Sequence, residues 1–410
     1  MGNGIKLNEK LYSFTTRCVK CAQCTLGYRN IEFEVVCPIY QRHKFFTYSL
    51  GGMAQLARAV HEGRLGIGES LVEVVYRCTS CGACGEMCAE VDFRDIVELQ
   101  HEVRAGCVEV GQVPLPLMLV IEGLKKEDNM LQRPKAERGK WAEGLGVKDI
   151  TKEGAEVYFH AGCRYSFDEE LWPVVRGAVK LLKEVGVEVG IAGKEETCCG
   201  GRAYEMGYQG ELTKYAENNI ELLRTAGVKV LVTCCADCYY SFKVLYDKIG
   251  KLGDLEVWHI TDYLWRLMKE GRLKLSKGLN LKVTYHDPCH LGRKVEPWVM
   301  WEGEVKRGEI YERPRELLRG IGGVELMEMR RNRENAWCCG AGGGVIDAYP
   351  DFARWVALER LKEAKSTGAE VLVTACPWCR RNFLDALKES GEGLEGLKVY
   401  DLVEFLVQAL

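Results

Sequence analysis

The stretch Val371-Leu-Val-Thr-Ala-Cys-Pro-Trp-Cys379 repeats the pattern of an earlier stretch, Val230-Leu-Val-Thr-Cys-Cys-Ala-Asp-Cys238. Each begins with apolar and β-branched residues, which predict a short buried strand. Each ends in Cys-x-x-Cys, so the thiols are expected directly after the carboxyl end of that strand. The alignment places Cys234 opposite Ala375, and we therefore leave Cys234 out of the repeated set of cysteines.

The repetition extends to three further cysteines in each copy. Both copies contain a single cysteine, then Cys-Cys-Gly, then Cys-x-x-Cys, in the same order and with similar gaps. The first set is Cys163, Cys198, Cys199, Cys235 and Cys238, and the second is Cys289, Cys338, Cys339, Cys376 and Cys379. Inert buried thiols would not recur in this order, so each set predicts a metal or redox site. Because the side chains of adjacent cysteines diverge, five thiols favour a cluster more open than a cube.

Strands and helices are expected to alternate through both copies. The predicted strands are 155–160, 187–192, 228–233 and 255–260 in the first copy, and 281–286, 323–329 and 370–374 in the second. The predicted amphipathic helices are 168–185, with Ser166 near its start as an N-cap, 205–226, and 400–410. This alternation predicts right-handed βαβ units and parallel sheets. Sites in such sheets lie beyond the carboxyl ends of the strands, so each set of five thiols should converge.

Eight more cysteines precede the repeats in two runs. Cys18, Cys21 and Cys24 are spaced as C-x-x-C-x-x-C, and the second run adds a fourth cysteine as C-x-x-C-x-x-C-x-x-x-C. This spacing is typical of ferredoxins with two 4Fe–4S clusters, in which the fourth cysteine ligates the other cluster. We assign one cluster to Cys18, Cys21, Cys24 and Cys88, and the other to Cys78, Cys81, Cys84 and Cys37.

Two features depart from the usual ferredoxin pattern. Twelve residues instead of three separate Cys24 from Cys37, so the loop 25–36 is an insertion of nine residues, and Cys88 is followed by Ala89 where proline is usual. Apolar residues at helical spacing within 52–76 favour a helical ferredoxin domain over a compact two-hairpin domain. Zinc is the alternative metal, but zinc favours pairs of cysteines and the triplets fit it badly.

Composition limits the other classes of function. The chain has twenty cysteines and no N-terminal apolar export signal, which predicts metal binding in a reducing compartment instead of disulfides. A net charge of −3 argues against a nucleic-acid partner. No run of eighteen apolar residues exists, so no direct membrane span is expected. These features predict a cytoplasmic protein, or one held at a membrane through a partner.

The sequence divides into three predicted domains and a connector. Residues 1–111 are expected to form a helical dicluster ferredoxin domain, 154–275 the first repeat and 276–410 the second. Between the ferredoxin domain and the first repeat, residues 112–153 contain Pro114, Pro116 and Pro134, which predict an irregular linker. Two cysteines, Cys107 and Cys234, have no assigned role.

The repeats resemble the CCG-domain iron–sulfur family. The likeness rests on His286-Asp-Pro-Cys289-His-Leu-Gly-Arg293, Asn335-Ala-Trp-Cys338-Cys339-Gly-Ala-Gly-Gly-Gly344 and Thr374-Ala-Cys376-Pro-Trp-Cys379. With the ferredoxin domain in front, nearly the whole chain resembles the D-type subunit of heterodisulfide reductase. The resemblance implies an α/β fold with two Rossmann-like CCG domains. Each would hold a non-cubane 4Fe–4S cluster through its five cysteines, with the disulfide of coenzyme M and coenzyme B between them.

Two functions follow from this resemblance. The first is the catalytic subunit of a heterodisulfide reductase-like complex, which reduces the coenzyme M–coenzyme B disulfide or a related one and exchanges electrons with a membrane cytochrome b-type subunit. The alternative is a non-catalytic electron-transfer subunit beside a flavoprotein dehydrogenase of lactate, glycolate or glycerol 3-phosphate, with quinone as acceptor. Both five-cysteine sets are complete, which favours the first. A zinc scaffold for protein contacts is a third class.

Several other residues near the cysteines have alternative roles. His160 and His286 each precede a cysteine by three residues, and they could donate a proton, hydrogen-bond a cluster sulfur, or only bond the backbone. His290 and Lys294 are candidates to bind an anionic substrate. The glycine-rich segment 340–344 lacks the Lys-Ser/Thr of a phosphate loop, so it predicts close backbone approach to a cluster.

Overall fold

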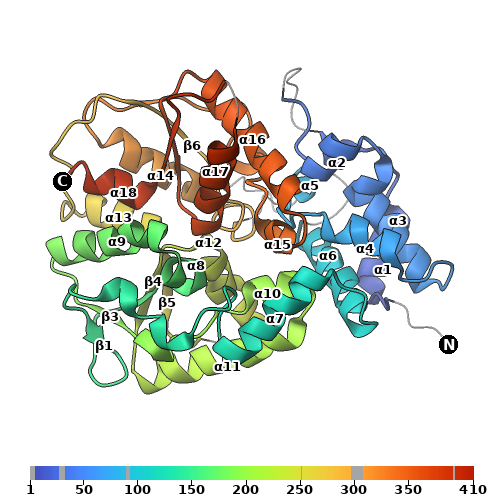
Figure 1. The fold of residues 1–410 in the computed structure, drawn as a ribbon, viewed down its shortest axis with the longest axis horizontal. Coiled ribbons are helices and arrows are strands. Elements are labelled where there is room, and N and C mark those ends of the chain that lie inside the picture. The colour runs from blue at the N-terminus through green and yellow to red at the C-terminus, as the bar shows by residue number, and fades with distance from the viewer. Residues whose placement is uncertain (1–4, 27–32, 89–92, 251, 297–307, 391–392) are drawn as a thin grey trace.

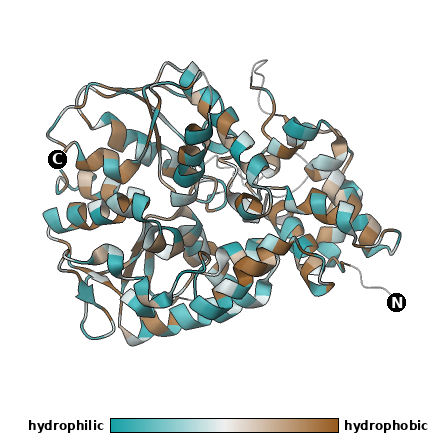
Figure 2. Cartoon of the chain, viewed as in Figure 1, coloured by the Kyte–Doolittle hydropathy of each residue, from teal (hydrophilic) through white to brown (hydrophobic). Residues whose placement is uncertain are grey.

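The computed structural model of this chain describes residues 5–26, 33–88, 93–250, 252–296, 308–390 and 393–410. Figure 1 shows a helical N-terminal domain beside two α/β units, which lie one above the other. Most helices alternate between polar and apolar residues (Figure 2), as expected for helices that each cover one side of a core. The predicted fold class, a helical domain followed by two parallel-sheet units, is confirmed.

Helices make up most of the N-terminal domain. They are α1 (Glu9–Arg17), α2 (Pro38–His43), α3 (Leu50–His61), α4 (Glu69–Tyr76), α5 (Ala83–Glu86) and α6 (Phe93–Glu109), with the short turns η1 (Gln23–Thr25) and η2 (Phe46–Tyr48). The predicted insertion 25–36 lies partly outside the described residues, and its ends meet in an antiparallel bridge between Leu26 and Val35. Ala89 also lies outside the described residues.

The connector 112–153 is more regular than its prolines predicted. Helix α7 (Leu115–Glu127) begins directly after Pro114, and Pro116 stands in its first turn. Proline is tolerated there because the first amides of a helix have no intrahelical acceptor. The turns η3 (Lys135–Glu137) and η4 (Lys140–Ala142) follow, and strand β1 (Lys148–Asp149) joins the first sheet. The prediction of an irregular linker is therefore wrong, while the domain boundaries stay predictions.

The first repeat forms a five-stranded parallel sheet in the order β1-β3-β2-β4-β5. Its strands are β2 (Val157–His160), β3 (Val189–Ile191), β4 (Val230–Thr233) and β5 (Glu256–His259). Its helices are α8 (Gly162–Phe167), α9 (Trp172–Glu184), α10 (Gly201–Glu205), α11 (Gln209–Thr225), α12 (Ala236–Tyr240) and α13 (Ile260–Lys269). His160 lies opposite Thr233, and Thr233 lies opposite His259, so the strand ends are level. The loops that follow therefore all leave one edge of the sheet.

The second repeat forms a four-stranded parallel sheet in the order β7-β6-β8-β9. Its strands are β6 (Lys282–Tyr285), β7 (Glu325–Leu326), β8 (Val371–Thr374) and β9 (Lys398–Asp401). Its helices are α14 (Glu309–Arg319), α15 (Val345–Ala348), α16 (Pro350–Ser366), α17 (Pro377–Glu389) and α18 (Leu402–Val407), with the turn η10 (Gly342–Gly344) before α15. Each predicted strand of both repeats is present, although β7 is much shorter than 323–329.

Two predicted helices of the first repeat begin or end differently in the structure. The helix predicted over 168–185 begins at Trp172, and Ser166 lies inside the preceding helix α8, so Ser166 is not its N-cap. The helix predicted over 205–226 is two helices, α10 and α11. Gly207, between them, has a φ of +99°, a conformation that interrupts a right-handed helix.

The last predicted helix, 400–410, is also shorter than expected. Strand β9 continues to Asp401, and α18 begins directly after it. Asp401 and Glu404 form a capping box, in which each side chain accepts a hydrogen bond from the backbone amide near the other. Such a box fixes the start of the helix, with Asp401 as its N-cap.

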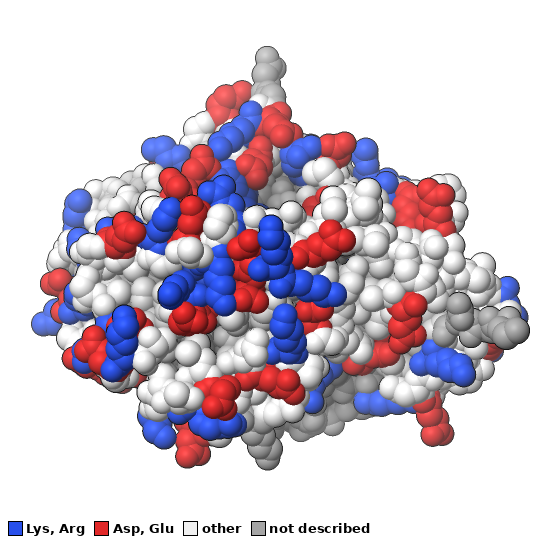
Figure 3. Space-filling view, turned by 60° about the horizontal axis from the view of Figure 1, so that its bottom comes forward, with Lys and Arg blue, Asp and Glu red and all other residues white. Residues whose placement is uncertain are grey.

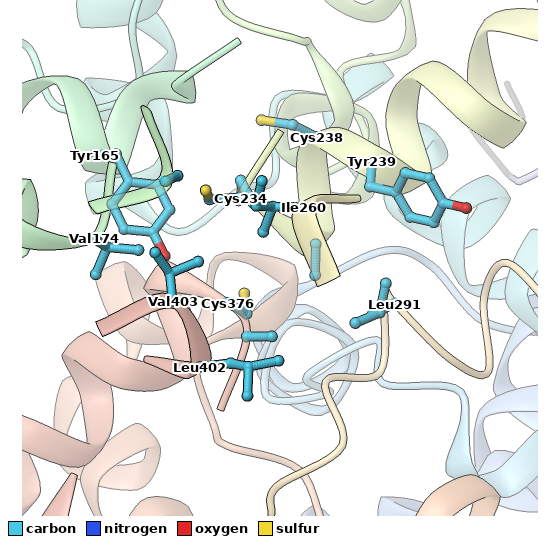
Figure 4. Close-up of a cluster of buried hydrophobic side chains, with 14 of the residues drawn as sticks. Tyr165, Val174, Cys234, Cys238, Tyr239, Ile260, Leu291, Cys376, Leu402 and Val403 are labelled. Atoms are coloured by element: carbon cyan, nitrogen blue, oxygen red, sulfur yellow. The ribbon is translucent and has the colours of Figure 1, made fainter. Parts of the chain in front are cut away.

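The two sheets share one hydrophobic core. Helix α18 of the second repeat packs against α9 of the first. The close-up in Figure 4 shows Tyr165 and Val174 of the first repeat next to Leu402 and Val403 of the second. The Tyr165 hydroxyl donates a hydrogen bond to Asp401 across this contact, with an O–O distance of 3.0 Å. The carboxyl ends of both sheets therefore face a common interface.

The surface carries both signs of charge. In the face shown by Figure 3, the described Lys and Arg side chains are interspersed with Asp and Glu, and they form no single basic stripe. In the part of the chain that the structure describes, no helix is both long and apolar enough to cross a bilayer.

The contact between the N-terminal domain and the second repeat gives a first prediction. A Cβ added at Gly342 would lie 2.4 Å from the carbonyl oxygen of Thr79, whereas a Cβ at Gly66 would meet no atom within 4 Å. We expect Gly342→Ala to destabilise the iron-loaded protein by about 1–3 kcal/mol, the usual cost of overpacking. Gly66→Ala should leave stability unchanged or slightly raised. Differential scanning calorimetry measures both, and equal melting temperatures would contradict the tight contact.

Candidate metal centres

The first set of five cysteines converges at the carboxyl edge of the first sheet. Cys163 follows β2, Cys198 and Cys199 follow β3, and Cys235 and Cys238 follow β4. All five are buried. Their thiols are neighbours in the order Cys163, Cys198, Cys199, Cys238 and Cys235, and each lies close enough to shift the pKa of the next. The structure thus brings together the five residues that the repeat predicted.

The second set is arranged in the same way. The thiol of Cys339 lies between those of Cys338 and Cys379, and Cys379 adjoins Cys376, each pair being close enough to shift the pKa of both members. Cys289 lies close enough to affect the pKa of its neighbours Cys338 and Cys339. This set is also entirely buried.

The two sets meet across the interface between the repeats. The thiols of Cys235 and Cys376 lie close enough to shift each other's pKa, although they belong to different sheets. Figure 4 shows the sulfur atoms of Cys238, Cys234 and Cys376 in this region. Ten thiols therefore occupy one continuous buried region, and not two separate surface sites.

The glycine of each Cys-Cys-Gly motif has a structural role. Gly200 and Gly340 have φ values of +78° and +91°, which favour glycine. Their amides donate hydrogen bonds to Cys198 Sγ at 3.4 Å and Cys338 Sγ at 3.3 Å. Amides that point at sulfur stabilise a negatively charged thiolate, so the same local geometry serves both repeats.

The first ferredoxin set surrounds a cavity. Cys18, Cys21, Cys24 and Cys88 line a cavity of about 310 Å³ near the surface. Cys21 is exposed, whereas Cys24 is buried. Burial raises the pKa of the Cys24 thiol to about 11, so a metal ion must displace its proton. Cys88 thus reaches the first triplet, as the ferredoxin spacing predicted.

The second ferredoxin set lies deeper in the molecule. Cys37, Cys78, Cys81 and Cys84 are close enough to affect one another's pKa. The Cys81 thiol also lies close enough to Cys338 of the second repeat for the two thiols to shift each other's pKa. This ferredoxin set therefore adjoins the second CCG set directly.

The donor atoms fit iron–sulfur clusters. Each ferredoxin set offers four thiols, and each repeat offers five that are all buried in a largely apolar core. Thiolate-only donor sets are typical of such clusters. Of the two unassigned cysteines, Cys107 is buried in α6 and Cys234 directly after β4, and neither belongs to the thiol sets described above.

His286 is a buried neighbour of the second CCG set. One of its ring nitrogens lies within 4.8 Å of the sulfur atoms of Cys339 and Cys379. Arg360 donates a hydrogen bond to His286 Nδ1 at 3.1 Å, so the ring proton resides on Nε2. Burial, with the guanidinium of Arg360 nearby, lowers the pKa of His286 to about 3. The neutral imidazole can donate a hydrogen bond but is not an acid near neutral pH.

His160 has a different set of neighbours. The hydroxyl of Tyr158 is 3.1 Å from His160 Nδ1, and Glu196 is 3.8 Å away. Burial lowers the pKa of His160. The equivalent histidines of the two repeats are therefore both buried, but of the two only His286 is hydrogen-bonded to an arginine among the described residues.

His290 and Lys294 already have anionic partners in the first repeat. His290 Nε2 lies 2.6 Å from a carboxylate oxygen of Glu205, and His290 Nδ1 lies 3.2 Å from Asp237. Lys294 forms a buried ion pair with the same Glu205. These two cations therefore link the repeats, and their charge is compensated before any substrate arrives.

Two residues outside the cysteine motifs also contact the sites. Arg138, from the connector, donates to Cys163 Sγ at 3.3 Å and pairs with Glu196 at 2.7 Å. Gln100 donates to Cys84 Sγ at 3.7 Å. Sequence periodicity did not predict the contacts of Arg138 with Cys163 or of Gln100 with Cys84, because the spacing within each pair matches no helical or strand period.

Comparison with known proteins places the chain in a family. The model of the cysteine-rich CCG domain matches residues 157–243 and 283–383, and the model of the 4Fe–4S dicluster domain matches 15–90. The D-type subunit of the dihydromethanophenazine:CoB–CoM heterodisulfide reductase of Methanosarcina mazei is 32% identical over 96% of this chain and 93% of that protein. The chain belongs to this CCG-domain iron–sulfur family. As a family member with a dicluster domain, it is an oxidoreductase that carries 4Fe–4S clusters and transfers electrons.

Another similar protein has quinone in its name. EtfAB:quinone oxidoreductase of Syntrophomonas wolfei is 31% identical over 82% of this CCG-domain chain and 47% of that longer protein. The solved structure of a hypothetical protein from Helicobacter pylori has a TM-score of 0.50, covers 76% of this chain and 57% of its own, and is 11% identical. That likeness concerns the fold alone.

Cysteine replacement tests the site assignments. We expect Cys339→Ser to lose the iron of about one cluster, because Cys339 lies between Cys338 and Cys379, while the ferredoxin signals persist. Cys107→Ser is the matched control, since Cys107 is equally buried but joins no set. Iron analysis with electron paramagnetic resonance (EPR) measures both variants. An unchanged iron content in Cys339→Ser would refute the assignment.

Proposed function

We propose that this protein is the catalytic iron–sulfur subunit of a heterodisulfide reductase-like complex. Its substrate would be the coenzyme M–coenzyme B disulfide or a related disulfide. The observation that carries this proposal is the contact between Cys235 and Cys376, which joins two complete five-thiol sets at one buried interface. A relay would need only one such set.

The proposed ligands are the sets described above. Cys163, Cys198, Cys199, Cys235 and Cys238 would hold one non-cubane cluster, and Cys289, Cys338, Cys339, Cys376 and Cys379 the other. Cys18, Cys21, Cys24 and Cys88, and then Cys37, Cys78, Cys81 and Cys84, would hold the ferredoxin-type clusters. When bound, each cluster supplies one-electron chemistry.

Two neighbouring sites suit the stoichiometry of disulfide reduction. Breaking one S–S bond consumes two electrons and two protons and yields two thiols. Paired sites at one interface would let each sulfur of the substrate face its own thiol set. The buried amides of Gly200 and Gly340 would stabilise negative charge at the two sets equally. Burial of all ten thiols would keep bulk water away from the reacting sulfurs.

The ferredoxin sets would form the supply line for electrons. Cys21 is exposed, and Cys81 adjoins Cys338, so the four sets extend from the surface to the interface. The surface beside Cys21 includes Val19, whose side chain is 67% exposed, and this surface would receive a partner. That partner would be a membrane cytochrome b-type subunit or a flavoprotein, with this chain on the cytoplasmic side.

A second function is supported by one comparison. The EtfAB:quinone oxidoreductase relative is 31% identical, against 32% for the heterodisulfide reductase relative, although it matches 82% of this chain instead of 96% and this chain spans only 47% of its length. In that case the chain would pass electrons from a flavoprotein dehydrogenase towards quinone without binding a disulfide.

An assay with a chemical donor distinguishes the two functions. We expect the iron-loaded protein to oxidise reduced viologen when the coenzyme M–coenzyme B disulfide is present. Because Cys376 adjoins both sets, Cys376→Ser should abolish this activity, and Cys107→Ser should retain it. Thiol release and viologen absorbance measure the reaction. No turnover by fully loaded protein, together with reduction of a quinone analogue, would establish the relay function instead.

A further inference from the structure

Arg104 lies where the ferredoxin domain meets both repeats. It belongs to α6 and is 1% exposed. Within its own domain it donates to the carbonyl oxygens of Val75 at 3.0 Å and Cys78 at 2.5 Å. It also donates to the carbonyl of Glu205 in the first repeat at 2.7 Å and of Gly343 in the second at 3.0 Å. One guanidinium thus joins three domains.

The positive charge of Arg104 has no carboxylate partner among the described residues. All four of its hydrogen bonds go to backbone carbonyl oxygens, and it takes part in none of the described ion pairs. Arg104 binds the backbone carbonyl of Glu205, but the side chain of Glu205 is already paired with His290 and Lys294. Burial lowers the pKa of nearby His101 well below its usual value, so that imidazole is neutral.

This charge lies beside the deeper ferredoxin set. Arg104 binds the carbonyl of Cys78, one of the four proposed ligands, and its charge favours the thiolate form of that cysteine. On the other side of the set, buried Arg293 donates to the carbonyl of Cys81 at 3.1 Å. Glu86 lies near Arg293 and offsets part of that second charge. Arg104 is therefore the less compensated of the two cations.

The outer ferredoxin set, which is Cys18, Cys21, Cys24 and Cys88, has no comparable buried cation among its described neighbours. The residues that line its cavity include one cationic residue, Lys20, and that side chain is exposed to solvent. Charges in water are screened, whereas a buried charge acts at a low effective dielectric constant. The potential of an iron–sulfur cluster depends on net charge, hydrogen bonds and solvent exposure.

We propose that Arg104 is a positioning residue that raises the reduction potential of the inner cluster, the one held by Cys37, Cys78, Cys81 and Cys84. This assignment rests on the ligand sets of the proposed function. A reduced cluster carries one more negative charge, which a buried cation stabilises. Electrons then pass favourably from the outer set to the inner one. The hydrogen bond to Gly343 joins the loop that carries this ligand set to the second repeat, where Cys81 lies beside Cys338.

Redox titration of the iron-loaded full chain, followed by EPR, tests this role. We expect Arg104→Met to lower the ratio of reduced to oxidised inner cluster at least tenfold, at the solution potential where the wild-type cluster is half reduced. For a one-electron couple this is a shift of about 59 mV. Arg104→Lys keeps the charge and should change the ratio much less. The outer cluster should titrate as in the wild type in both variants.

Arg176→Met is the matched control. Arg176 also donates only to carbonyl oxygens among the described residues, those of Trp141 and Glu143, but it lies on α9. Its loss should leave both ferredoxin potentials unchanged. Should Arg104→Met fail to retain iron, Arg104→Gln replaces it, because glutamine keeps a donor group and lacks the charge.

Two results would overturn the proposal. One is an unchanged inner-cluster potential in Arg104→Met or Arg104→Gln; the other is an equal shift in Arg104→Lys, which would make geometry and not charge responsible. The titration needs no disulfide, so its outcome is independent of whether the protein reduces one. Cys78→Ser assigns the inner signal, and loss of the outer signal instead would show that the ligand sets, and not the role of Arg104, are wrong.

Discussion

The parallel pairing of strands within each of two short sheets holds the thiol sites of this protein together. Parallel strands with right-handed crossovers release all their following loops at one edge. In each repeat those loops carry the five cysteines, so the sheet brings together thiols that are tens of residues apart. Because the two sheets pack through α9 and α18, their cysteine edges face each other, and Cys235 meets Cys376. Neither repeat alone would produce that contact.

Buried cations are the second consequence of this arrangement. Arg138, Arg104 and Arg293 all lie within the core and donate to a sulfur atom or to carbonyls of cysteine residues. Arg138 is paired with Glu196, whereas Arg104 has no carboxylate partner among the described residues, and an unpaired buried cation is costly in an apolar protein core. Beside sets of thiolates that carry negative charge, the same cation is compensated when the sites are filled. The charge pattern therefore suits a protein whose iron–sulfur clusters are part of its folded state.

The two repeats differ in their contacts with the ferredoxin domain. Among the described contacts between thiols, only the second CCG set reaches the ferredoxin domain, through Cys81 and Cys338. The first set instead contacts Arg138 of the connector. The glycine-rich turn Gly342–Gly344 explains part of this difference, because it allows Thr79 and Arg104 to approach the second repeat closely. The turn therefore contacts a loop of the N-terminal domain, while the close approach to a cluster that its composition predicted stays a prediction.

Regular local spacing was enough to predict the strands of both repeats and the two groups of five cysteines that the sheets bring together. The assignment of each fourth cysteine to the other ferredoxin run also came from spacing, and it stays a prediction. The same spacing misjudged α7, since a proline that starts a helix and one that breaks it look alike without the fold. The folded chain was needed to show that Arg360 bonds His286, that Glu205 pairs with Lys294 and that Arg104 reaches Gly343. Such contacts join residues far apart along the chain, and they leave no periodic pattern in either partner.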